Sequence, residues 1–268
     1  MALNSSKTGT PILSVEIAGR KLNLWLDSGA SISVLSSAVA RLCRIESILN
    51  QSGSIRSASD YQVRFKGAIV PEMKIGNLII HDLPVVIVNR FDLRIRQASR
   101  VKLKIDGIIG WDLIRYLDLV IDRKNRLIII RKPEIDTQFL ATDRNLFWLG
   151  YPIISLSSRE GLPLHFGLDT GSTSTKLTDN IHHKIDLKSN KRILKVGSAG
   201  GFNEISVRVF PDFSLILCGK MIHYPNIYSH PLHFAAFVRM DGVFGNDLLE
   251  KGRVRIDFLN GRFEFMPY

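Results

Sequence analysis

Apolar and polar residues alternate over much of the chain, which is the pattern of β-strands that bury one face. The run PILSVEIAGRKLNLWL (11–26) predicts two strands around a turn at Ala18-Gly19-Arg20. The run MKIGNLIIHDLPVVIV (73–88) predicts two more around Gly76-Asn77. Strand-like stretches far outnumber helical ones, so the pattern predicts an all-β fold class with a few short helices.

The short helices are expected at three places. One is Ser36–Leu42, where Ser36 is a candidate N-cap, and the others begin directly after Gly110 and Gly245. Asp112 and Asp247 would then lie in first helical turns, where a negative charge is favoured. We therefore expect these two aspartates to have a structural role.

Four blocks recur along the chain in the same order and with nearly constant spacing. LWLDSGASISVL (24–35) corresponds to FGLDTGSTSTKL (166–177), with an offset of 142 between Asp27 and Asp169. IDGIIGWDLI (105–114) corresponds to MDGVFGNDLL (240–249), with an offset of 135. Between them, SASDY (57–61) corresponds to SAGGF (198–202), and Pro71-Glu72 to Pro211-Asp212. The order of the blocks predicts two copies of one unit: residues 8–133, a linker at 134–147, and residues 148–268.

The composition, 45% hydrophobic and 23% charged residues, is that of a soluble globular protein. No apolar run approaches the ~20 residues of a membrane-spanning helix. The N-terminus MALNSSKTGTP has neither the basic nor the apolar part of a signal peptide. We expect a cytoplasmic protein, with export as the alternative if a leader has been removed.

The formal net charge is +11, which can attract nucleic acid, anionic membranes or acidic peptides. Most of the basic residues are scattered, and the densest run is RFDLRIRQASRVKLK, Arg90–Lys104. This run accounts for the smaller offset of the last block, and we expect an insertion of the first copy at the surface. No zinc-finger spacing, RNA-binding aromatic motif or Walker loop is present, so nucleic acid is not an expected partner.

The cysteines and histidines give weak signals. Cys43 and Cys218 lie in opposite halves with no CxxC pattern, so we expect two buried thiols and no disulfide framework. His230-x-x-His233 has a spacing that suits two metal ligands, but it lies between prolines and has no evident third ligand. No metal and no cofactor are therefore expected.

The aspartate of LWLDSGASISVL raises a question, because a carboxylate directly after an apolar run is costly to desolvate. Taken alone, Asp-Ser-Gly is an ordinary turn sequence. Its recurrence at Asp169-Thr170-Gly171, inside an ordered repeat, favours a function for both aspartates. The paired motifs DSGAS and DTGST, each followed by two apolar residues and a glycine (IIG and VFG), resemble the clan AA aspartic peptidases, which include pepsins and retroviral-type proteases. The resemblance extends from about Thr10 to Phe265.

This resemblance implies two β-rich lobes related by a pseudo-twofold axis, each contributing one catalytic aspartate, Asp27 and Asp169. We expect their carboxylates to lie about 3–5 Å apart and to share a proton. The resemblance further implies that Ser28, Gly29, Thr170 and Gly171 support the dyad, and that Gly110 and Gly245 buttress the two loops.

A flap is expected to close over the substrate, formed from residues 54–63 or 195–204. Tyr61 and Phe202 are candidate aromatic lids, with ordinary strand aromatics as the alternative. The first segment lacks the glycines usual in a flap, whereas Gly197, Gly200 and Gly201 provide them in the second.

The predicted function is an aspartic-type endopeptidase that binds a polypeptide in extended form. A monomer is expected, because both motifs lie on one chain. The alternative is a catalytically silent module that binds peptides on the same fold.

Overall fold

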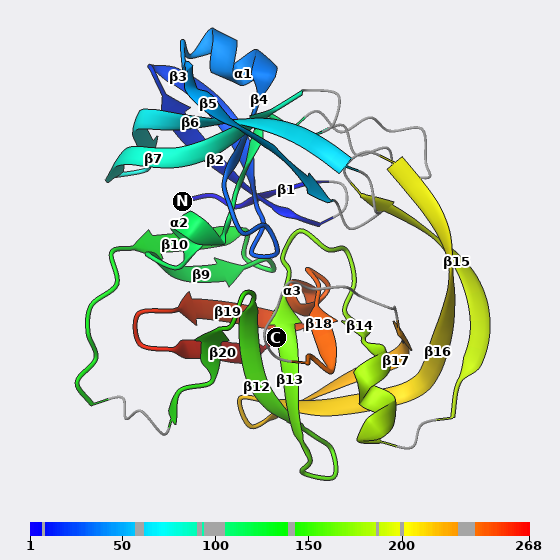
Figure 1. Ribbon diagram of the computed structural model, residues 1–268. Coiled ribbons are helices and arrows are strands. Elements are labelled where there is room, and N and C mark those ends of the chain that lie inside the picture. The colour runs from blue at the N-terminus through cyan, green and yellow to red at the C-terminus, as the bar shows by residue number, and fades with distance from the viewer. Residues whose placement is uncertain are drawn as a thin grey trace. The chain divides into compact units, whose positions relative to one another are not determined.

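The computed structural model describes residues 1–6, 9–56, 62–89, 93, 105–138, 143–185, 188–198, 201–229 and 239–268. Its regular structure is almost entirely β (Figure 1). The predicted all-β class with a few short helices is therefore confirmed. None of the helices in these described ranges is long and apolar enough to cross a membrane.

The chain divides into two compact units, and each unit is built from segments that are separated in the sequence. One unit comprises Ile12–Leu113 with Ile193–Ile205. The other comprises Met1–Pro11, Ile114–Arg192 and Ser206–Tyr268. Asp27 thus belongs to the first unit, and Asp169 belongs to the second.

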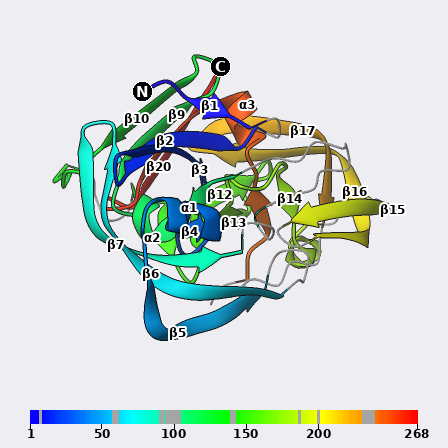
Figure 2. The same ribbon diagram turned by 90° about the horizontal axis from the view of Figure 1, so that it is seen from above.

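The first sheet is built on hairpins that the sequence pattern predicts. Ala18 and Gly19 have φ values of 50° and 70°, the left-handed conformation that a two-residue hairpin turn requires. The second predicted hairpin also forms, with Gly76 at φ 60°. Figure 2 shows β5, β6 and β7 as the long strands of this sheet. The strands are β1 (Asn4–Ser5), β2 (Pro11–Ile17), β3 (Arg20–Leu26), β4 (Val34–Ser36), β5 (Ser47–Arg56), β6 (Gln62–Ile75), β7 (Leu78–Val88) and β8 (Gly107–Ile109).

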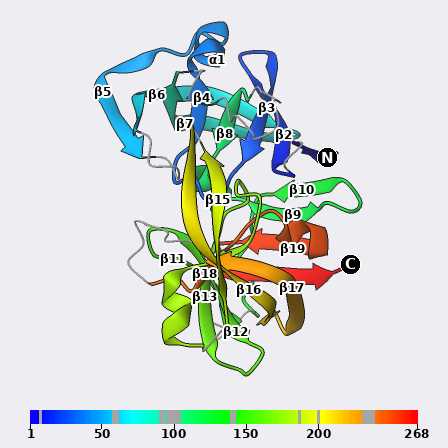
Figure 3. The same ribbon diagram turned by 90° about the vertical axis from the view of Figure 1, so that its right-hand side faces the viewer.

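The second sheet contains the strands from Leu146 to Phe244. Its longest strand, β16, has 17 residues and pairs antiparallel with β17. Figure 3 shows β15 and β16 as long neighbouring strands. The strands are β11 (Leu146–Trp148), β12 (Pro152–Ser158), β13 (Pro163–Leu168), β14 (Lys176–Leu177), β15 (Asn190–Ser198), β16 (Gly201–Leu217), β17 (Lys220–Ser229) and β18 (Gly242–Phe244).

The two sheets have the same strand order. The first runs β1-β2-β3-β8-β4-β7-β6-β5, and the second is identical after ten is added to each label. The registers match as well: β3 pairs parallel with β8 through Leu24 and Gly107, and β13 pairs parallel with β18 through Phe166 and Gly242. These pairings differ by the offsets 142 and 135 of the sequence blocks.

A four-stranded antiparallel sheet of the second unit joins the ends of the two repeated segments. Its order is β10-β9-β19-β20 (Figure 1), and all five residues of β9 are buried. The strands are β9 (Asp118–Asp122), β10 (Leu127–Arg131), β19 (Gly252–Asp257) and β20 (Arg262–Pro267).

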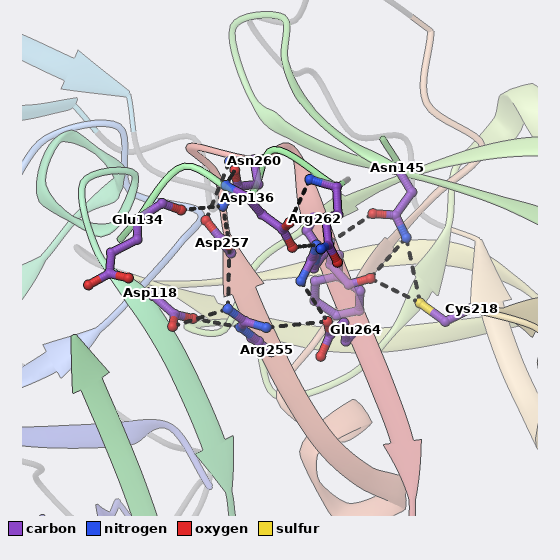
Figure 4. A network of polar contacts seen from close by, with 12 residues as sticks. Asp118, Glu134, Asp136, Asn145, Cys218, Arg255, Asp257, Asn260, Arg262 and Glu264 are labelled. Atoms are coloured by element: carbon purple, nitrogen blue, oxygen red, sulfur yellow. Dashed lines mark hydrogen bonds and ion pairs between the residues drawn. The ribbon is translucent and has the colours of Figure 1, made fainter. Parts of the chain in front are cut away.

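Arg255 is the centre of a polar network on this sheet (Figure 4). Its Nε lies 2.8 Å from Oδ1 of Asp118, and its terminal nitrogens reach Asp257 at 3.5 Å and Glu264 at 3.4 Å. The side chains of Asp118 and Asp257 are only 6% and 2% exposed. Because buried carboxylates need a partner, Arg255 neutralises charge that the sheet would otherwise enclose.

We expect Arg255→Met to lower the free energy of unfolding by about 3 kcal/mol, because it leaves two buried carboxylates without their main cation. Arg131→Met is the matched control: Arg131 approaches the same Asp118 at 3.8 Å, but its side chain is 55% exposed. Its loss is expected to cost less than about 1 kcal/mol. Urea denaturation of both variants measures the difference, and equal losses would contradict this role of Arg255.

The three predicted helices are present. Helix α1 spans Ser37–Leu42, and the side chain of its N-cap, Ser36, accepts a hydrogen bond from the Val39 N–H at 3.2 Å. Helix α2 (Trp111–Ile114) directly follows Gly110 and has Asp112 in its first turn, as predicted. Helix α3 (Leu248–Lys251) begins three residues after Gly245, so Asp247 is its N-cap residue and does not lie in its first turn, contrary to prediction. A 3-10 helix, η2 (Asp179–His183), follows β14.

Two other expectations have different outcomes. The two cysteines are free, but only Cys43 is buried; Cys218 is exposed, contrary to prediction, because it forms with Gly219 the two-residue turn between β16 and β17. The basic segment Arg90–Lys104 lies outside the described residues except for Leu93, so its predicted surface position stays a prediction.

Candidate active site

The loop that carries Asp27 begins where β3 ends. The Asp27 N–H donates to the Ile109 carbonyl of β8 at 3.0 Å, which extends the parallel pairing of the two strands. The Gly29 N–H then donates to Oδ1 of Asp27 at 2.9 Å, and the Ala30 N–H to the Asp27 carbonyl at 3.2 Å. Asp27 is partly buried. The loop therefore fixes one carboxylate oxygen with a backbone donor.

The loop that carries Asp169 is built in the same way at the end of β13. The Asp169 N–H donates to the Phe244 carbonyl of β18 at 2.9 Å. The Ser172 N–H donates to Oδ1 of Asp169 at 2.8 Å and is 3.1 Å from the Asp169 carbonyl. Asp169 is also partly buried. The donor to the carboxylate comes three residues after the aspartate here, compared with two in the first loop.

The glycines after β8 and β18 lie against these loops. A Cβ on Gly110 would be 2.6 Å from the Ile32 carbonyl carbon, and one on Gly245 would be 2.4 Å from that of Ser174. The residue after each glycine donates its N–H to the loop: Trp111 to the Ala30 carbonyl at 2.7 Å, and Asn246 to the Ser172 carbonyl at 2.8 Å. Only glycine permits this approach of two backbones.

A hydroxyl and a second aspartate lock each loop to the helix behind it. In the first unit, the N–H and hydroxyl of Ser33 donate to the two oxygens of Asp112 at 2.9 and 2.8 Å. The Ser33 hydroxyl also accepts from the Gly110 N–H at 3.1 Å. Ser33 and Asp112 are 79 residues apart, so their hydrogen bonds connect the loop to a helix that is distant in the sequence.

The second unit repeats this lock. The N–H and hydroxyl of Thr175 donate to Oδ1 of Asp247 at 2.8 and 2.7 Å, and the Gly245 N–H donates to the Thr175 hydroxyl at 3.1 Å. Tyr224 adds a hydrogen bond from its hydroxyl to that of Thr175 at 3.2 Å. Sequence reasoning did not identify Ser33 and Thr175, although a hydroxyl residue recurs there at the same offset of 142 as the aspartates.

Comparison with known families gives one match at the first loop. Residues 13–114 match the family of the gag-polyprotein putative aspartyl protease. This range contains Asp27, its loop and Gly110, together with the Ser33–Asp112 pair. Residues 13–114 are thus similar to the retropepsin-like aspartyl proteases. The family resemblance seen in the sequence is confirmed for this part of the chain. No curated protein matches the chain.

The remaining predicted supports lie next to each aspartate: Ser28 and Gly29 within the retropepsin-like segment, and Thr170 and Gly171 in the second unit. Ser28 is almost wholly buried, with 1% of its surface exposed, and its counterpart Thr170 in the second unit is 2% exposed. Gly29 and Gly171 are partly buried. Their contribution to a dyad stays a prediction.

The flap candidates fall largely outside the described residues. Tyr61 belongs to the undescribed range 57–61, although both flanking strands, β5 and β6, are defined. Phe202 lies in β16, but its side chain is outside the described part, as are the positions of Ala199 and Gly200. The assignment of both aromatic residues to a flap stays a prediction.

The described residues contain no group of three or more metal-ligating side chains. His230 and His233, the pair with metal-ligand spacing, lie outside the described ranges.

Asp112 and Asp247 are buried behind the loops, and burial raises the pKa of each carboxyl above its ordinary value of 3.8. The hydrogen bonds from Ser33 and Thr175 act in the opposite direction but do not cancel the effect. Both aspartates are therefore structural, as the sequence predicted, although they act as hydrogen-bond acceptors for the loops.

The raised pKa of Asp247 predicts a pH-dependent effect of Asp247→Asn. An ionised carboxyl with a raised pKa opposes folding, and this penalty disappears as the pH falls through the raised value toward 3.8. Asparagine keeps an acceptor for Thr175 and carries no charge. We therefore expect the stability of the variant relative to the natural protein to be higher at pH 7 than at pH 4.

Urea denaturation at both pH values measures this difference. The control is Asp212→Asn, because the side chain of Asp212 is 82% exposed. If Asp247→Asn changes the free energy of unfolding by the same amount at pH 4 and at pH 7, the raised pKa of Asp247 is contradicted.

Proposed function

We propose that the protein is an aspartic endopeptidase in which Asp27 and Asp169 together hydrolyse a peptide bond of an extended polypeptide. The observation that carries the proposal is the equal construction of the two loops. Each aspartate follows a strand, bonds through its N–H to a neighbouring strand, and has one carboxylate oxygen held by a loop N–H. Each loop is then locked by a glycine and a hydroxyl–aspartate pair.

We further propose that the chain contains two copies of one unit, with lobes at 8–133 and 148–268 and a linker at 134–147. The identical strand order of the two eight-stranded sheets supports this division. The family match supports the proposal directly only for residues 13–114. The catalytic role of Asp169 is supported by its loop and by the repeat.

In the proposed mechanism, two carboxylates at close range hold one proton between them, because ionising both is costly. The ionised carboxylate takes a proton from a water molecule, and the water oxygen attacks the scissile carbonyl carbon. The protonated carboxyl donates a hydrogen bond to the carbonyl oxygen. When the C–N bond breaks, a proton passes to the leaving amine, and the products are a carboxylic acid and an amine.

The supporting residues serve this chemistry by restricting movement. Gly29 and Ser172 each donate an N–H to one carboxylate oxygen, which restricts the rotation of each carboxyl group. Ser28 and Thr170 are proposed to hold the two loops in register with each other. Neither a covalent intermediate nor a metal ion takes part.

Incubation with denatured casein between about pH 3 and pH 7 tests the function. We expect cleavage inside the casein chain, inhibition by a pepstatin-type compound that mimics the tetrahedral intermediate, and no effect of EDTA. Binding of casein without cleavage at any pH would instead indicate a silent peptide-binding module. Loss of cleavage in EDTA would contradict the metal-free mechanism.

A further inference from the structure

The strands next to the two aspartate loops carry side chains of opposite chemistry at equivalent positions. In the first unit, Val34 of β4 pairs with Val86 of β7 and with Ile108 of β8. Val34 and Val86 belong to a buried apolar cluster, and Ile32 and Ile108 pack against it. The wall beside Asp27 is thus formed by aliphatic side chains.

The second unit has the same strand pairings with different residues. Lys176 of β14 pairs with Val243 of β18, and Leu177 pairs parallel with Ser229 of β17, which aligns Lys176 with Tyr228. By the offset of 142, Ser174, Lys176 and Tyr228 stand where the first unit has Ile32, Val34 and Val86. Three aliphatic side chains are therefore replaced by two hydroxyls and an ammonium.

The two hydroxyls bind each other. Ser174 Oγ and the Tyr228 hydroxyl lie 2.5 Å apart, which fixes the tyrosine over the strand that follows the Asp169 loop. The intervening residue, Thr175, directs its hydroxyl to Asp247 on the other side of the strand. Because residues aligned on neighbouring strands point to the same face, Lys176 and Tyr228 share one face of the sheet, and Ser174 reaches Tyr228 through their hydrogen bond.

Lys176 is an unusual residue at this place, because it is partly buried and forms no hydrogen bond or ion pair through its ammonium group within the described residues. Burial lowers the pKa of Lys176, whereas the charges of Asp169 and Asp247 act to raise it. A desolvated ammonium without a direct partner is costly, and a ligand that supplies a carboxylate would remove that cost.

We propose that Ser174, Lys176 and Tyr228 form a subsite for a carboxylate of the substrate beside Asp169, opposite in character to the apolar wall beside Asp27. This inference rests on the proposed peptidase function and adds a substrate class to it: peptides with an acidic side chain on one side of the scissile bond and an aliphatic one on the other. Because one of the two hydroxyls donates to the other, the pair of Ser174 and Tyr228 has one O–H left as a further donor to the same carboxylate.

Matched peptides that differ only by Glu or Gln at one position test the subsite. All carry acetyl and amide ends, so the side chain is the sole source of a carboxylate; a second set with a free C-terminus tests a terminal carboxylate instead. We expect kcat/KM to be about tenfold higher for Glu than for Gln at one position, the value of one charge-assisted hydrogen bond. In Lys176→Val, which copies Val34, this ratio is expected to fall to about one.

Lys220→Met is the matched control, because it removes the same charge at the exposed first residue of β17, eight residues before Tyr228. It is expected to keep the Glu/Gln ratio of the natural protein. An unchanged ratio in Lys176→Val, or a ratio near one at every position in the natural protein, would overturn the subsite. If only the free C-terminal carboxylate is preferred and Lys176→Val removes this preference, the site is a terminal-carboxylate site.

Failure of the proposed function gives a different result. If no peptide is cleaved, the same Glu and Gln peptides are labelled and their binding is measured by fluorescence anisotropy. About tenfold tighter binding of the Glu peptide that Lys176→Val removes would support the subsite without the peptidase. Equal binding of both peptides would overturn the inference itself.

Discussion

Replacing Asp27 with asparagine is expected to abolish peptide hydrolysis while leaving the protein folded. Asparagine preserves the Oδ1 acceptor that binds the Gly29 N–H, so the loop keeps its internal hydrogen bond. It cannot share or transfer the proton on which the mechanism depends. Since general acid–base catalysis contributes roughly 10²–10⁴-fold, we expect kcat to fall by at least about a hundredfold. Asp169→Asn is expected to have an equally large effect.

The measurement is initial-rate hydrolysis of one peptide by the natural protein and the two variants, with thermal unfolding as the test of folding. Asp212→Asn makes the same chemical change at an exposed carboxylate and is expected to retain full activity. An Asp169→Asn variant that keeps most of its activity would contradict a dyad. Activity that depends on Asp27 alone would limit the catalytic assignment to the segment that the family match covers.

Gly245→Ala is expected to lower the free energy of unfolding by about 3 kcal/mol, the upper part of the range for overpacked cores. The added methyl group would lie 2.4, 2.6 and 2.7 Å from the backbone C, O and N atoms of Ser174. Backbone atoms cannot rotate away as a flexible side chain can, so β18 or the Asp169 loop must shift. Because the same movement displaces the Asp169 carboxylate, we also expect a large fall in kcat.

Gly219→Ala is the control for this prediction. Gly219 has a φ of 72°, and a Cβ at this position would have no neighbouring atom within 4 Å. Its substitution therefore costs only the left-handed backbone strain of about 1 kcal/mol. Urea denaturation compares the two variants, and peptide hydrolysis is measured on each. A Gly245→Ala protein as stable and as active as Gly219→Ala would show that the close approach of the two backbones is unimportant.

The sequence by itself determined the local elements and the positions of the aspartates. Alternation predicted the hairpins β2–β3 and β6–β7, because a strand with one buried face needs period two. The N-cap of α1 could be predicted because the side chain of Ser36 bonds to a backbone N–H only three residues later, that of Val39. Asp27 and Asp169 could be paired from the sequence because the blocks that contain them recur in the same order with nearly constant spacing.

The tertiary structure alone decided which distant residues meet. The Ser33–Asp112 and Thr175–Asp247 pairs join residues 79 and 72 positions apart, and no local pattern specifies such a partner. The pairing of β9 with β19 is equally remote in sequence. Lys176 looked like one more scattered cation until the pairings of β14 with β17 and β18 placed it at the position equivalent to Val34 in the apolar wall of the first unit. Hydrophobic periodicity reports which face of a strand is buried, whereas the chemistry on that face depends on neighbours that only folding brings together.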